Sequence, residues 1–582
     1  MNDYFQLVEE LVKKLLYDLY KFPVYKKLDF KYTNKDHSGD LTLILFSLSK
    51  ELKKPVNEVG SIIGSYVKEK LKGYVKFYIV EGFLNFIFKD NYYVNLINIM
   101  LNSNFYNLKI KNPKKIMVEY SSPNANKPLH LGHLRNCLIG VFISKILKMF
   151  GHNIIRTQII NDRGIHICKS MIAWIKFGKG KTPNDCSLKG DHFVGKYYNL
   201  FDKIYKEEIN NVKNNNEVSI LKDARNLLIK WENKDTNTIS IWKKMNQWVY
   251  DGFKKTYHKI GISFDKTEYE SKIYEIGKNI VKKGLEKNIF FKKKDGSVWI
   301  DLSKEGFYHK LLLRSDQTSV YLTQDLGNAV KRFNKYKIDN LVYVVGKEQN
   351  YHFKTLFAIL KRLGFIWVNK LYHLSYEMVT LPSGRMKSRE GNVVTVDSII
   401  NEIISIAKKK FLKKASVNTH EKTYNIIGIG ALKYHFLKVD PKKEISFDIN
   451  KSISLKGRTG TYVQYTYSRI RSLERKFFKL FPTKNNFNWK NVVLDTYEKN
   501  LIKILSKYPL VLKKSCMYFN PSLVANYVYE VSKCFNNLYQ NKKLLDTLNV
   551  IQCNANMTII CITGNILKYG MNLLGIDMVD KM

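Results

Sequence analysis

The sequence has few cysteines for its length, and they form no metal-binding or disulfide pattern. It contains seven cysteines in 582 residues, and no two of them are separated by just two residues. No group of cysteines and histidines has the spacing of a zinc site. An odd number of scattered thiols also argues against a disulfide framework, so we predict reduced thiols, as in the cytosol, and no bound metal.

Long apolar runs are missing too. No uninterrupted apolar stretch approaches the roughly 20 residues that span a bilayer. The N-terminal stretch M-N-D-Y-F-Q-L-V-E-E-L is too acidic and too amphipathic for a signal peptide. We therefore expect a soluble, cytoplasmic protein that does not bind a membrane.

Acidic residues are scarce relative to basic ones. The chain has 97 Lys and Arg but 51 Asp and Glu, which gives a formal net charge of +46. Such a charge favours a polyanionic partner such as RNA, with an affinity that falls steeply with salt. The chain is also crowded with Lys, Asn, Ile, Tyr and Phe, as an AT-rich gene would produce, so part of the charge is compositional.

One stretch changes its hydrophobic period from that of a strand to that of a helix. The apolar run Ile116–Val118 predicts a buried strand, and Ser121 to Pro128 form a loop. From Leu131 apolar residues recur every four positions, and Gly151 follows as a C-terminal stop. His130, Gly132 and His133 therefore lie where a strand leads into a helix.

The start of a helix favours an anion, because free backbone N–H groups and the helix dipole meet there. Two imidazoles at this point can donate to phosphate or ribose oxygens, and Gly132 lets a nucleotide lie against the backbone. We therefore predict an ATP site. Taken alone, H-L-G-H is equally consistent with a structural turn.

A second basic motif favours the ATP site. Residues 384–391, G-R-M-K-S-R-E-G, form a glycine-bounded loop after a strand-like run from Leu371 to Val379. The two segments together resemble the HIGH-type and KMSKS-type motifs of class I aminoacyl-tRNA synthetases. Over nearly its whole length, the chain is similar to arginyl-tRNA synthetases. Three segments carry this similarity: E-Y-S-S-P-N-A-N-K-P-L-H-L-G-H, Y-L-T-Q-D at 321–325 and G-R-T-G-T-Y-V-Q-Y-T-Y-S-R-I-R-S at 457–472.

The length suggests about three domains. Residues 1–107 show two helical stripes, one at Phe5–Leu19 and one at Leu41–Leu52, followed by strands at 74–78 and 83–88. They predict an α/β domain, which in the family that the chain resembles binds the elbow of tRNA. A mere scaffold or dimerisation domain is the alternative.

Residues 108–450 alternate strand and helix, which predicts a Rossmann-like, doubly wound parallel sheet with ligands at the carboxyl ends of its strands. We expect further strands near 154–160, 298–302, 311–313, 319–323 and 341–345. Residues 180–290 form a polar, helical insertion of unknown function. Helical periodicity takes over in residues 451–582, which resemble the family's all-helical anticodon-binding domain.

A site for arginine needs acids, because a guanidinium is planar, always charged and best held by forked contacts to carboxylates. Asp325, which we place at the end of a strand carrying Tyr321, and Glu119, at the end of the earlier strand, are the candidates. A helix N-cap is the alternative for Asp325. The resemblance assigns arginine binding to Glu119, Asn124, Tyr321, Asp325 and Gln349.

The implied reaction needs no enzyme nucleophile. The carboxylate of L-arginine attacks the α-phosphate of ATP, and the adenylate then transfers arginine to the 3′ end of tRNA(Arg). Catalysis should come from alignment and from cations that oppose phosphate charge. We expect Mg²⁺ to arrive with ATP instead of occupying a fixed protein site. The predicted ATP site comprises Pro128, His130, Gly132, His133, Met386, Lys387 and Ser388.

The basic loop departs from the family pattern. Arg385 replaces its first lysine, Ser388 replaces the second, and Lys387 stands where the family has serine. Many arginyl enzymes lack the second lysine and carry one just before the HIGH-type motif, and Lys127 fits that substitution. We predict catalytic roles for Lys127, His130, His133 and Lys387; an exposed loop lysine is the alternative for Lys127.

In the C-terminal region, Tyr462, Tyr465 and Arg469 interleave aromatic rings with a cation, as surfaces that stack RNA bases do. A packed helix face is the alternative, since Tyr465 and Arg469 are four residues apart. The partners are therefore expected to be tRNA(Arg), L-arginine and ATP, with the enzyme a monomer. A small-molecule adenylyltransferase and a catalytically inactive tRNA-binding relative remain as other hypotheses.

Overall fold

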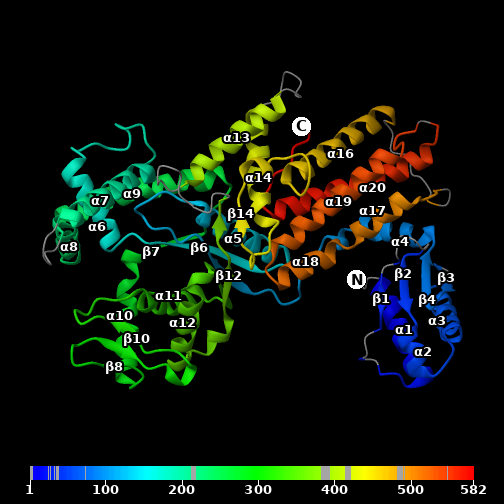
Figure 1. The fold of residues 1–582 in the computed structure, drawn as a ribbon, viewed down its shortest axis with the longest axis horizontal. Helices are drawn as coiled ribbons and strands as arrows, with labels where there is room; N and C mark the ends of the chain where they lie inside the picture. The colour runs from blue at the N-terminus through cyan, green and yellow to red at the C-terminus, as the bar shows by residue number, and fades with distance from the viewer. Residues whose placement is uncertain are drawn as a thin grey trace. The chain divides into compact units, whose positions relative to one another are not determined.

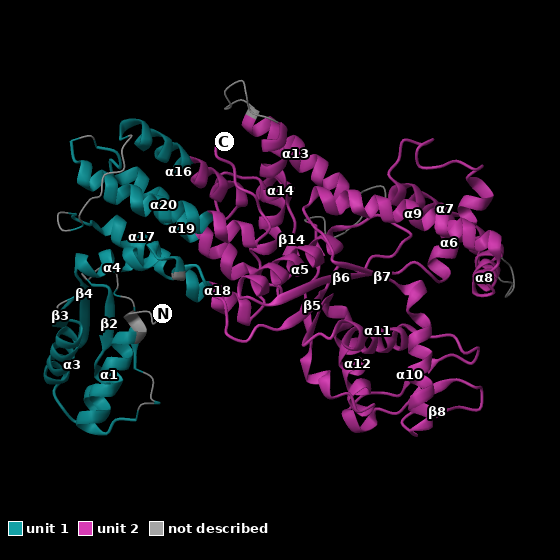
Figure 2. Ribbon diagram, turned by 180° about the vertical axis from the view of Figure 1, so that it is seen from behind, with its two compact units in different colours: residues 1–107, 469–511, 530–567 teal, residues 108–468, 512–529, 568–582 magenta. Residues whose placement is uncertain are grey.

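The computed structural model describes most of the chain. The described residues are 4–23, 25, 28–31, 33, 39–72, 74–211, 218–381, 394–412, 421–481, 489, 492–546 and 548–582. They divide into two compact units, coloured separately in Figure 2. Unit 1 comprises residues 1–107, 469–511 and 530–567, and unit 2 comprises residues 108–468, 512–529 and 568–582.

The N-terminal part of unit 1 is an α/β domain, as predicted. Its antiparallel sheet has the order β1-β2-β4-β3. The strands and helices are α1 (Tyr4–Tyr20), β1 (Phe30–Lys31), β2 (Leu41–Ile44), α2 (Phe46–Leu52), α3 (Val56–Lys70), β3 (Val75–Val80), β4 (Phe83–Phe88) and α4 (Asp90–Leu101). The predicted helix at Leu41–Leu52 is wrong in its first half. Leu41–Ile44 pairs with β4 instead, and its first three side chains are buried, as in a strand that is covered on both faces.

The rest of unit 1 is helical. It contains α17 (Thr496–Ser506) and parts of α16 (Gly460–Leu480), α18 (Tyr508–Met517), α19 (Pro521–Asn541) and α20 (Val550–Leu573), the four helices whose remaining residues belong to unit 2. Helix α20 is long and apolar enough to cross a membrane by length and composition, although polar residues such as Asn554 interrupt it. Of its most apolar window, 61% is buried inside the protein, as expected of a core helix.

Unit 2 is built on a five-stranded sheet with the order β12-β11-β5-β6-β7, in which every neighbouring pair is parallel. Its strands are β5 (Lys115–Glu119), β6 (Asn153–Ile160), β7 (Lys266–Tyr269), β11 (Asn340–Gly346) and β12 (Leu371–Tyr376). The chain order reverses between β5 and β11. This is the doubly wound topology expected from the alternating sequence, and such a reversal creates a ligand-binding crevice at the carboxyl ends of the two strands.

Helices connect and cover these strands (Figure 1). They are α5 (Leu131–Met149), α6 (Ile165–Phe177), α7 (Gly190–Asn211), α8 (Ser219–Glu232), α9 (Thr236–Lys259), α10 (Tyr274–Glu286), α11 (Tyr321–Tyr336), α12 (Asn350–Arg362), α13 (Val396–Leu412), α14 (Glu421–Leu437) and α15 (Ile449–Ser452). Helix α5 can lie close to β5 because a Cβ on Gly140 would lie 2.2 Å from the Tyr120 ring.

Two predicted strands belong to a different sheet. β8 (Phe291–Lys292), β9 (Val298–Ile300) and β10 (Lys310–Leu313) form a separate antiparallel sheet. β13 (Val379–Thr380) and β14 (Ile445–Ser446) form a short parallel pair. The predicted strand at Ser319–Thr323 is wrong, because helix α11 begins at Tyr321. Within the predicted insertion, residues 190–259 form α7, α8 and α9, and the chain then returns to the main sheet as β7.

Candidate active site

One side chain of α5, Asn136, connects the end of β5 to β11, on the two sides of the expected crevice. The Asn136 amide accepts a hydrogen bond from the backbone N–H of Ser121 (2.5 Å) and donates to the carbonyl oxygen of Val344 (2.7 Å). Ser121 and Ser122 both have positive φ, at 84° and 46°. Such non-glycine conformations persist where surrounding contacts impose them, often at functional sites. Asn136 therefore fixes the two strand ends at which the ligands are expected.

His130 and His133 begin helix α5. His130 is its N-cap, and Nδ1 of His130 accepts from the backbone N–H of Gly132 at 3.1 Å. Nδ1 of His133 accepts from the backbone N–H of His130 at 3.2 Å. A neutral imidazole that accepts at Nδ1 carries its proton on Nε2. Each histidine therefore presents an Nε2–H donor.

Both imidazoles are neutral at physiological pH. Burial, together with the nearby charge of Lys127, lowers the pKa of His130 to about 4. Burial, His130 and Lys127 also hold the pKa of His133 well below its usual range. The two ring centroids are 3.9 Å apart. The pair can donate hydrogen bonds to an anion, but it cannot supply positive charge, which leaves that role to lysine.

Lys127 and Pro128 are half-buried and lie against the insertion. A Cβ on Gly195 of α7 would lie 2.9 Å from Cδ of Pro128 and 3.5 Å from Cα of Lys127. The influence of Lys127 on both histidines places its ammonium group near them. The structure thus brings together four residues of the predicted ATP site, Pro128, His130, Gly132 and His133, with the predicted catalytic Lys127 beside them.

The second predicted motif can be located only through its C-terminal flank. Met386, Lys387 and Ser388 lie outside the described residues. The described chain resumes beside the histidines, where Thr395 forms an antiparallel bridge with His130 and the backbone N–H of Val396 donates to the carbonyl oxygen of Leu129 at 2.8 Å. Thr395 and Val396, which follow the basic motif in the sequence, therefore pair with the loop that carries the histidines.

Tyr321 and Asp325 lie on a helix, which corrects the strand predicted there. They are separated by four residues on α11, so they share one face of it. The N-cap is Val320, so the N-cap alternative for Asp325 is also wrong. Asp325 accepts a hydrogen bond at 2.6 Å from Nε2 of His352 on α12. Tyr321 is 64% exposed, so its ring is available to cover a ligand.

Glu119 is buried and already paired with a guanidinium of the protein itself. Nη1 of Arg332 donates to Oε2 of Glu119, and Nε and Nη2 of Arg332 contact Oε2 of Glu268 at 2.9 and 2.8 Å. Arg332 is fully buried. Ser122 approaches the other oxygen of Glu119, Oε1, at 3.4 Å. Only Oε1 is therefore left for a ligand.

Asn124 and Gln349 lie at strand ends. Asn124 forms a bridge with Asn161, just beyond β6, and its amide oxygen accepts from the side chain of Asn161 at 3.0 Å. Gln349 is exposed in the short helix η4 (Lys347–Gln349), which follows β11. The five predicted arginine-binding residues thus surround the carboxyl ends of β5, β6 and β11.

The sequence prediction missed Glu270, a buried acid at the carboxyl end of β7. It lies in the first turn after this strand and is 6% exposed. Burial raises the pKa of Glu270 to about 7, and Arg163 opposes that shift. The charges of Asp325 and Glu270 interact, and Glu270 also influences Tyr321. The signal available in the sequence was E-Y-E-S at 268–271, which covers the end of β7 and the turn after it, but β7 itself was not predicted.

The predicted tRNA-binding residues lie on α16, where two of them contact α19. The ring of Tyr462 is 5.4 Å from that of Tyr529. Arg469 donates to the Asn536 amide oxygen at 2.5 Å and lies 4.5 Å from the centroid of the Tyr539 ring. These contacts favour the packed-face alternative for Tyr462 and Arg469, whereas Tyr465 is 37% exposed.

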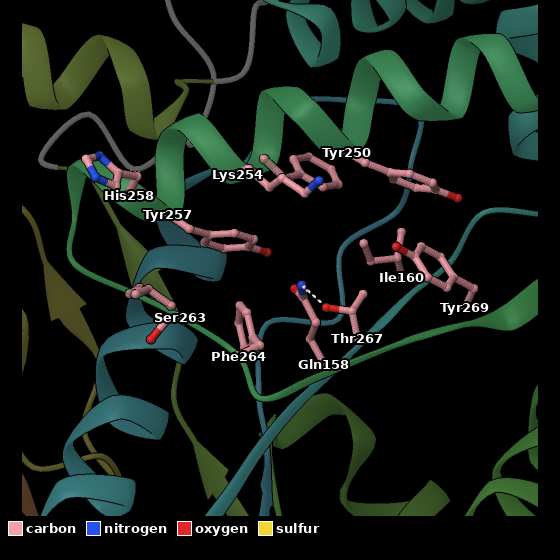
Figure 3. A pocket seen from close by; sticks show the side chains of 12 residues that line it. Gln158, Ile160, Tyr250, Lys254, Tyr257, His258, Ser263, Phe264, Thr267 and Tyr269 are labelled. Carbon is pink, nitrogen blue, oxygen red and sulfur yellow. Dashed lines mark hydrogen bonds between the residues drawn. The ribbon is translucent and has the colours of Figure 1, made fainter.

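A cavity of about 260 Å³ lies between α9 and strands β6 and β7 (Figure 3). Gln158 points into it and donates to Thr267 at 3.2 Å. None of the sequence-predicted site residues lines it. Tyr257, on its wall, shares a 2.6 Å hydrogen bond with Ser121, so the cavity adjoins the loop that follows β5.

Family comparisons agree with this arrangement. Residues 95–449 match the family described as "tRNA synthetases class I (R), catalytic domain", and residues 463–582 match the "DALR anticodon binding domain". The doubly wound sheet, with two histidines at the first helix of its switch point, is thus that of a class I aminoacyl-tRNA synthetase.

Individual relatives identify the family within this class. The chain is 42% identical over 603 residues to the arginine–tRNA ligase of Flavobacterium psychrophilum, covering 99% of both chains, and 43% identical to that of Bacteroides fragilis, covering 96% of both. The Thermus thermophilus arginyl-tRNA synthetase structure shares the fold, with a TM-score of 0.74 at 22% identity, covering 99% of this chain and 100% of that one. The chain belongs to the arginyl-tRNA synthetase family.

Proposed function

We propose that the chain is an active arginine–tRNA ligase that makes arginyl-adenylate from L-arginine and ATP and then transfers arginine to the 3′ end of tRNA(Arg). One observation supports this proposal most strongly: the anion-binding N-terminus of a helix and a group of acidic side chains lie at the same edge of the sheet. The first suits the triphosphate of ATP, and the second suits a guanidinium.

Activation joins the substrates without a covalent enzyme intermediate. A carboxylate oxygen of arginine forms a bond to the α-phosphorus, and the bond from that phosphorus to the pyrophosphate oxygen breaks. His130 and His133 donate Nε2–H bonds to the phosphates or ribose, and Lys127 opposes their charge, as does Lys387 in our proposal. Pro128, Gly132, Met386 and Ser388 complete the ATP site, and Mg²⁺ arrives with the nucleotide.

Arginine is selected by charge and shape. Asp325 and Glu270 receive the guanidinium and Tyr321 covers it, while Glu119 Oε1, Asn124 and Gln349 contact the α-amino and carboxylate end. Neutral citrulline would leave a buried carboxylate unpaired, which costs about 1–3 kcal/mol or more. Lysine offers a point charge in place of the planar fork.

tRNA would bind along the basic surface. We assign the tRNA elbow to residues 1–107, catalysis to 108–450 and the anticodon to 451–582, with Tyr465 as the first candidate for stacking a base, ahead of Tyr462 and Arg469. The net charge of +46 supports an RNA partner. We expect the enzyme to be a cytoplasmic monomer that does not bind a membrane.

Arginine-dependent exchange of pyrophosphate into ATP tests the proposal. We expect exchange with arginine and none with lysine or citrulline, and running it with and without tRNA shows whether activation needs bound tRNA. Absence of exchange under both conditions, in folded protein that still binds tRNA, would establish the alternative of a catalytically inactive tRNA-binding relative.

A further inference from the structure

A group of charged side chains centred on Asp397 joins three helices of unit 2. The carboxylate of Asp397, in the first turn of α13, accepts hydrogen bonds from the Lys189 ammonium group, from Nε2 of His192 (3.0 Å) and from the Thr256 hydroxyl (3.1 Å). Lys189 also lies 3.1 Å from Oδ2 of Asp191. We call these five residues the Asp397 cluster. Four of them belong to the insertion, whose function the sequence leaves open.

The Asp397 cluster is an ion-pair network and not a metal site. Asp191, His192 and Asp397 offer ligand atoms within 4.8 Å of one another, as a metal site would. The Lys189 ammonium group contacts both carboxylates, so a divalent cation would have to displace it. Burial alone would raise the pKa of Asp397, but hydrogen bonds from His192 and Lys189 hold it well below its usual range. Asp397 therefore remains ionised at neutral pH.

Two glycines allow α7 and α9 to approach closely enough to form this network. A Cβ on Gly252 of α9 would lie 2.4 Å from Oδ1 of Asp191, and a Cβ on Gly190 would lie 2.0 Å from the carbonyl oxygen of Trp248. No real Cβ contact is that short, so any other residue would push the helices apart. The close approach of α7 and α9 therefore fixes the position of Lys189 relative to Thr256.

Both sides of the ion pair also contact the loop that carries the phosphate-binding groups. On the side of α13, Thr395, two residues before Asp397, pairs with His130, and Val396, one residue before it, donates to Leu129. On the side of α7, Gly195 lies against Lys127 and Pro128. The loop from Lys127 to His130 is therefore in contact with both of the segments that the Asp397 cluster joins.

We propose that Asp397 is a positioning residue for the loop from Lys127 to His130. Its contacts with Lys189 and His192 attach α13 to the insertion, and the insertion then holds this loop in the geometry that binds the triphosphate of ATP. This inference rests on the proposed function and gives the insertion a role in activation. Displacing a reacting group by about 1 Å can cost on the order of 100-fold in rate, so a remote residue that fixes the loop can control the chemistry.

The test compares Asp397→Asn with wild type in arginine-dependent pyrophosphate exchange, using the full chain. We expect the KM for ATP to rise about 10-fold or more, with the KM for arginine changing less than about twofold. His192→Gln, at a side chain that is 29% exposed, should give a smaller rise in the same direction. Asp265→Asn is the matched control. Asp265, just before β7, forms a bidentate pair with Arg156 of β6, so this variant also loses a carboxylate from an ion pair but should leave both KM values unchanged.

A general loss of stability would lower the melting temperature and raise both KM values together, and that result would overturn the proposal. Hydrogen exchange of the amides from Leu129 to His133 provides a readout that does not depend on catalysis. These amides should exchange faster in Asp397→Asn and at the wild-type rate in Asp265→Asn. If wild type shows no pyrophosphate exchange, the proposed function fails, while unchanged amide exchange in Asp397→Asn would still refute the positioning role by itself.

Discussion

Two substitutions of His130 should separate its role in folding from its role in activation. Nδ1 caps helix α5 by accepting from Gly132, and Nε2–H points away as a donor. Asparagine places an amide oxygen near the position of Nδ1 and is among the best N-cap residues. Glutamine is longer and places an amide N–H near the position of Nε2, but it caps helices poorly. Each variant therefore keeps one of the two hydrogen bonds.

The magnitudes follow from the two hydrogen bonds. Losing an N-cap costs about 1 kcal/mol of folding free energy, so His130→Gln should be less stable by roughly that amount. A hydrogen bond to a charged group contributes about 1.5–3 kcal/mol. His130→Asn should therefore slow activation by about 10- to 150-fold while its stability stays near that of wild type.

The assays are pyrophosphate exchange at saturating arginine and urea unfolding followed by circular dichroism. His130→Gln should keep activation within a few-fold of wild type. The opposite pattern, in which His130→Asn stays active and His130→Gln does not, would show that the N-cap, and not the Nε2–H donor, matters for ATP. Equal loss in both variants would mean that the ring itself is required, and the assignment of the tautomer would be refuted.

Three further predictions concern the groups around the substrates. Lys127→Ala should lower the rate of pyrophosphate exchange about 10-fold or more and leave the melting temperature unchanged, because the lysine opposes phosphate charge; an unchanged rate would exclude it from the ATP site. Because burial raises the pKa of Glu270 to about 7 and the guanidinium binds its ionised form, the KM for arginine should fall as the pH rises from 6 to 8. Calorimetry in two buffers should detect proton release on arginine binding near pH 7. Glu270→Gln should abolish both the proton release and the pH dependence of the KM for arginine. A KM for arginine that does not change with pH in wild type would contradict the assignment of Glu270 to the arginine site. His352→Ala should raise the KM for arginine by about 10-fold by freeing the Asp325 carboxylate to rotate, with partial recovery in His352→Gln, whereas an equal rise in the KM for ATP would indicate a general disturbance.

The sequence predicted the ATP side of the site better than the arginine side, because the first is local in the chain. The strand before Tyr120, the loop and the helix from Leu131 lie within one continuous segment, so hydrophobic period and turn residues were sufficient to locate it. Asp325 and Tyr321 were assigned to a strand because Val320–Thr323 is apolar and β-branched. The buried face of α11, which includes Leu322, Leu326 and Ala329, prevailed over that local preference.

Contacts between distant segments could not be predicted. Asn136 joins β5 to β11, and Asp397 joins α13 to α7, yet neither lies in a motif with a recognisable spacing. The separate sheet of β8, β9 and β10 was missed for a related reason. Short apolar runs indicate strands without indicating which sheet they enter, and pairing depends on turns and long-range packing.

The acids of the proposed arginine site differ in how far the protein itself compensates their charge. Glu119 and Glu268 share the guanidinium of Arg332. Burial nevertheless raises the pKa of Glu119, whereas Arg332 and Lys331 outweigh burial at Glu268 and lower its pKa. Glu270 is equally buried, and burial raises its pKa to about 7 although the charge of Arg163 and a hydrogen bond with Gln324 oppose that shift. A second guanidinium beside Asp325 and Glu270 would oppose this effect of burial, as Arg332 does at Glu268. The free energy needed to ionise a buried acid thus becomes, in this proposal, part of the selectivity for arginine.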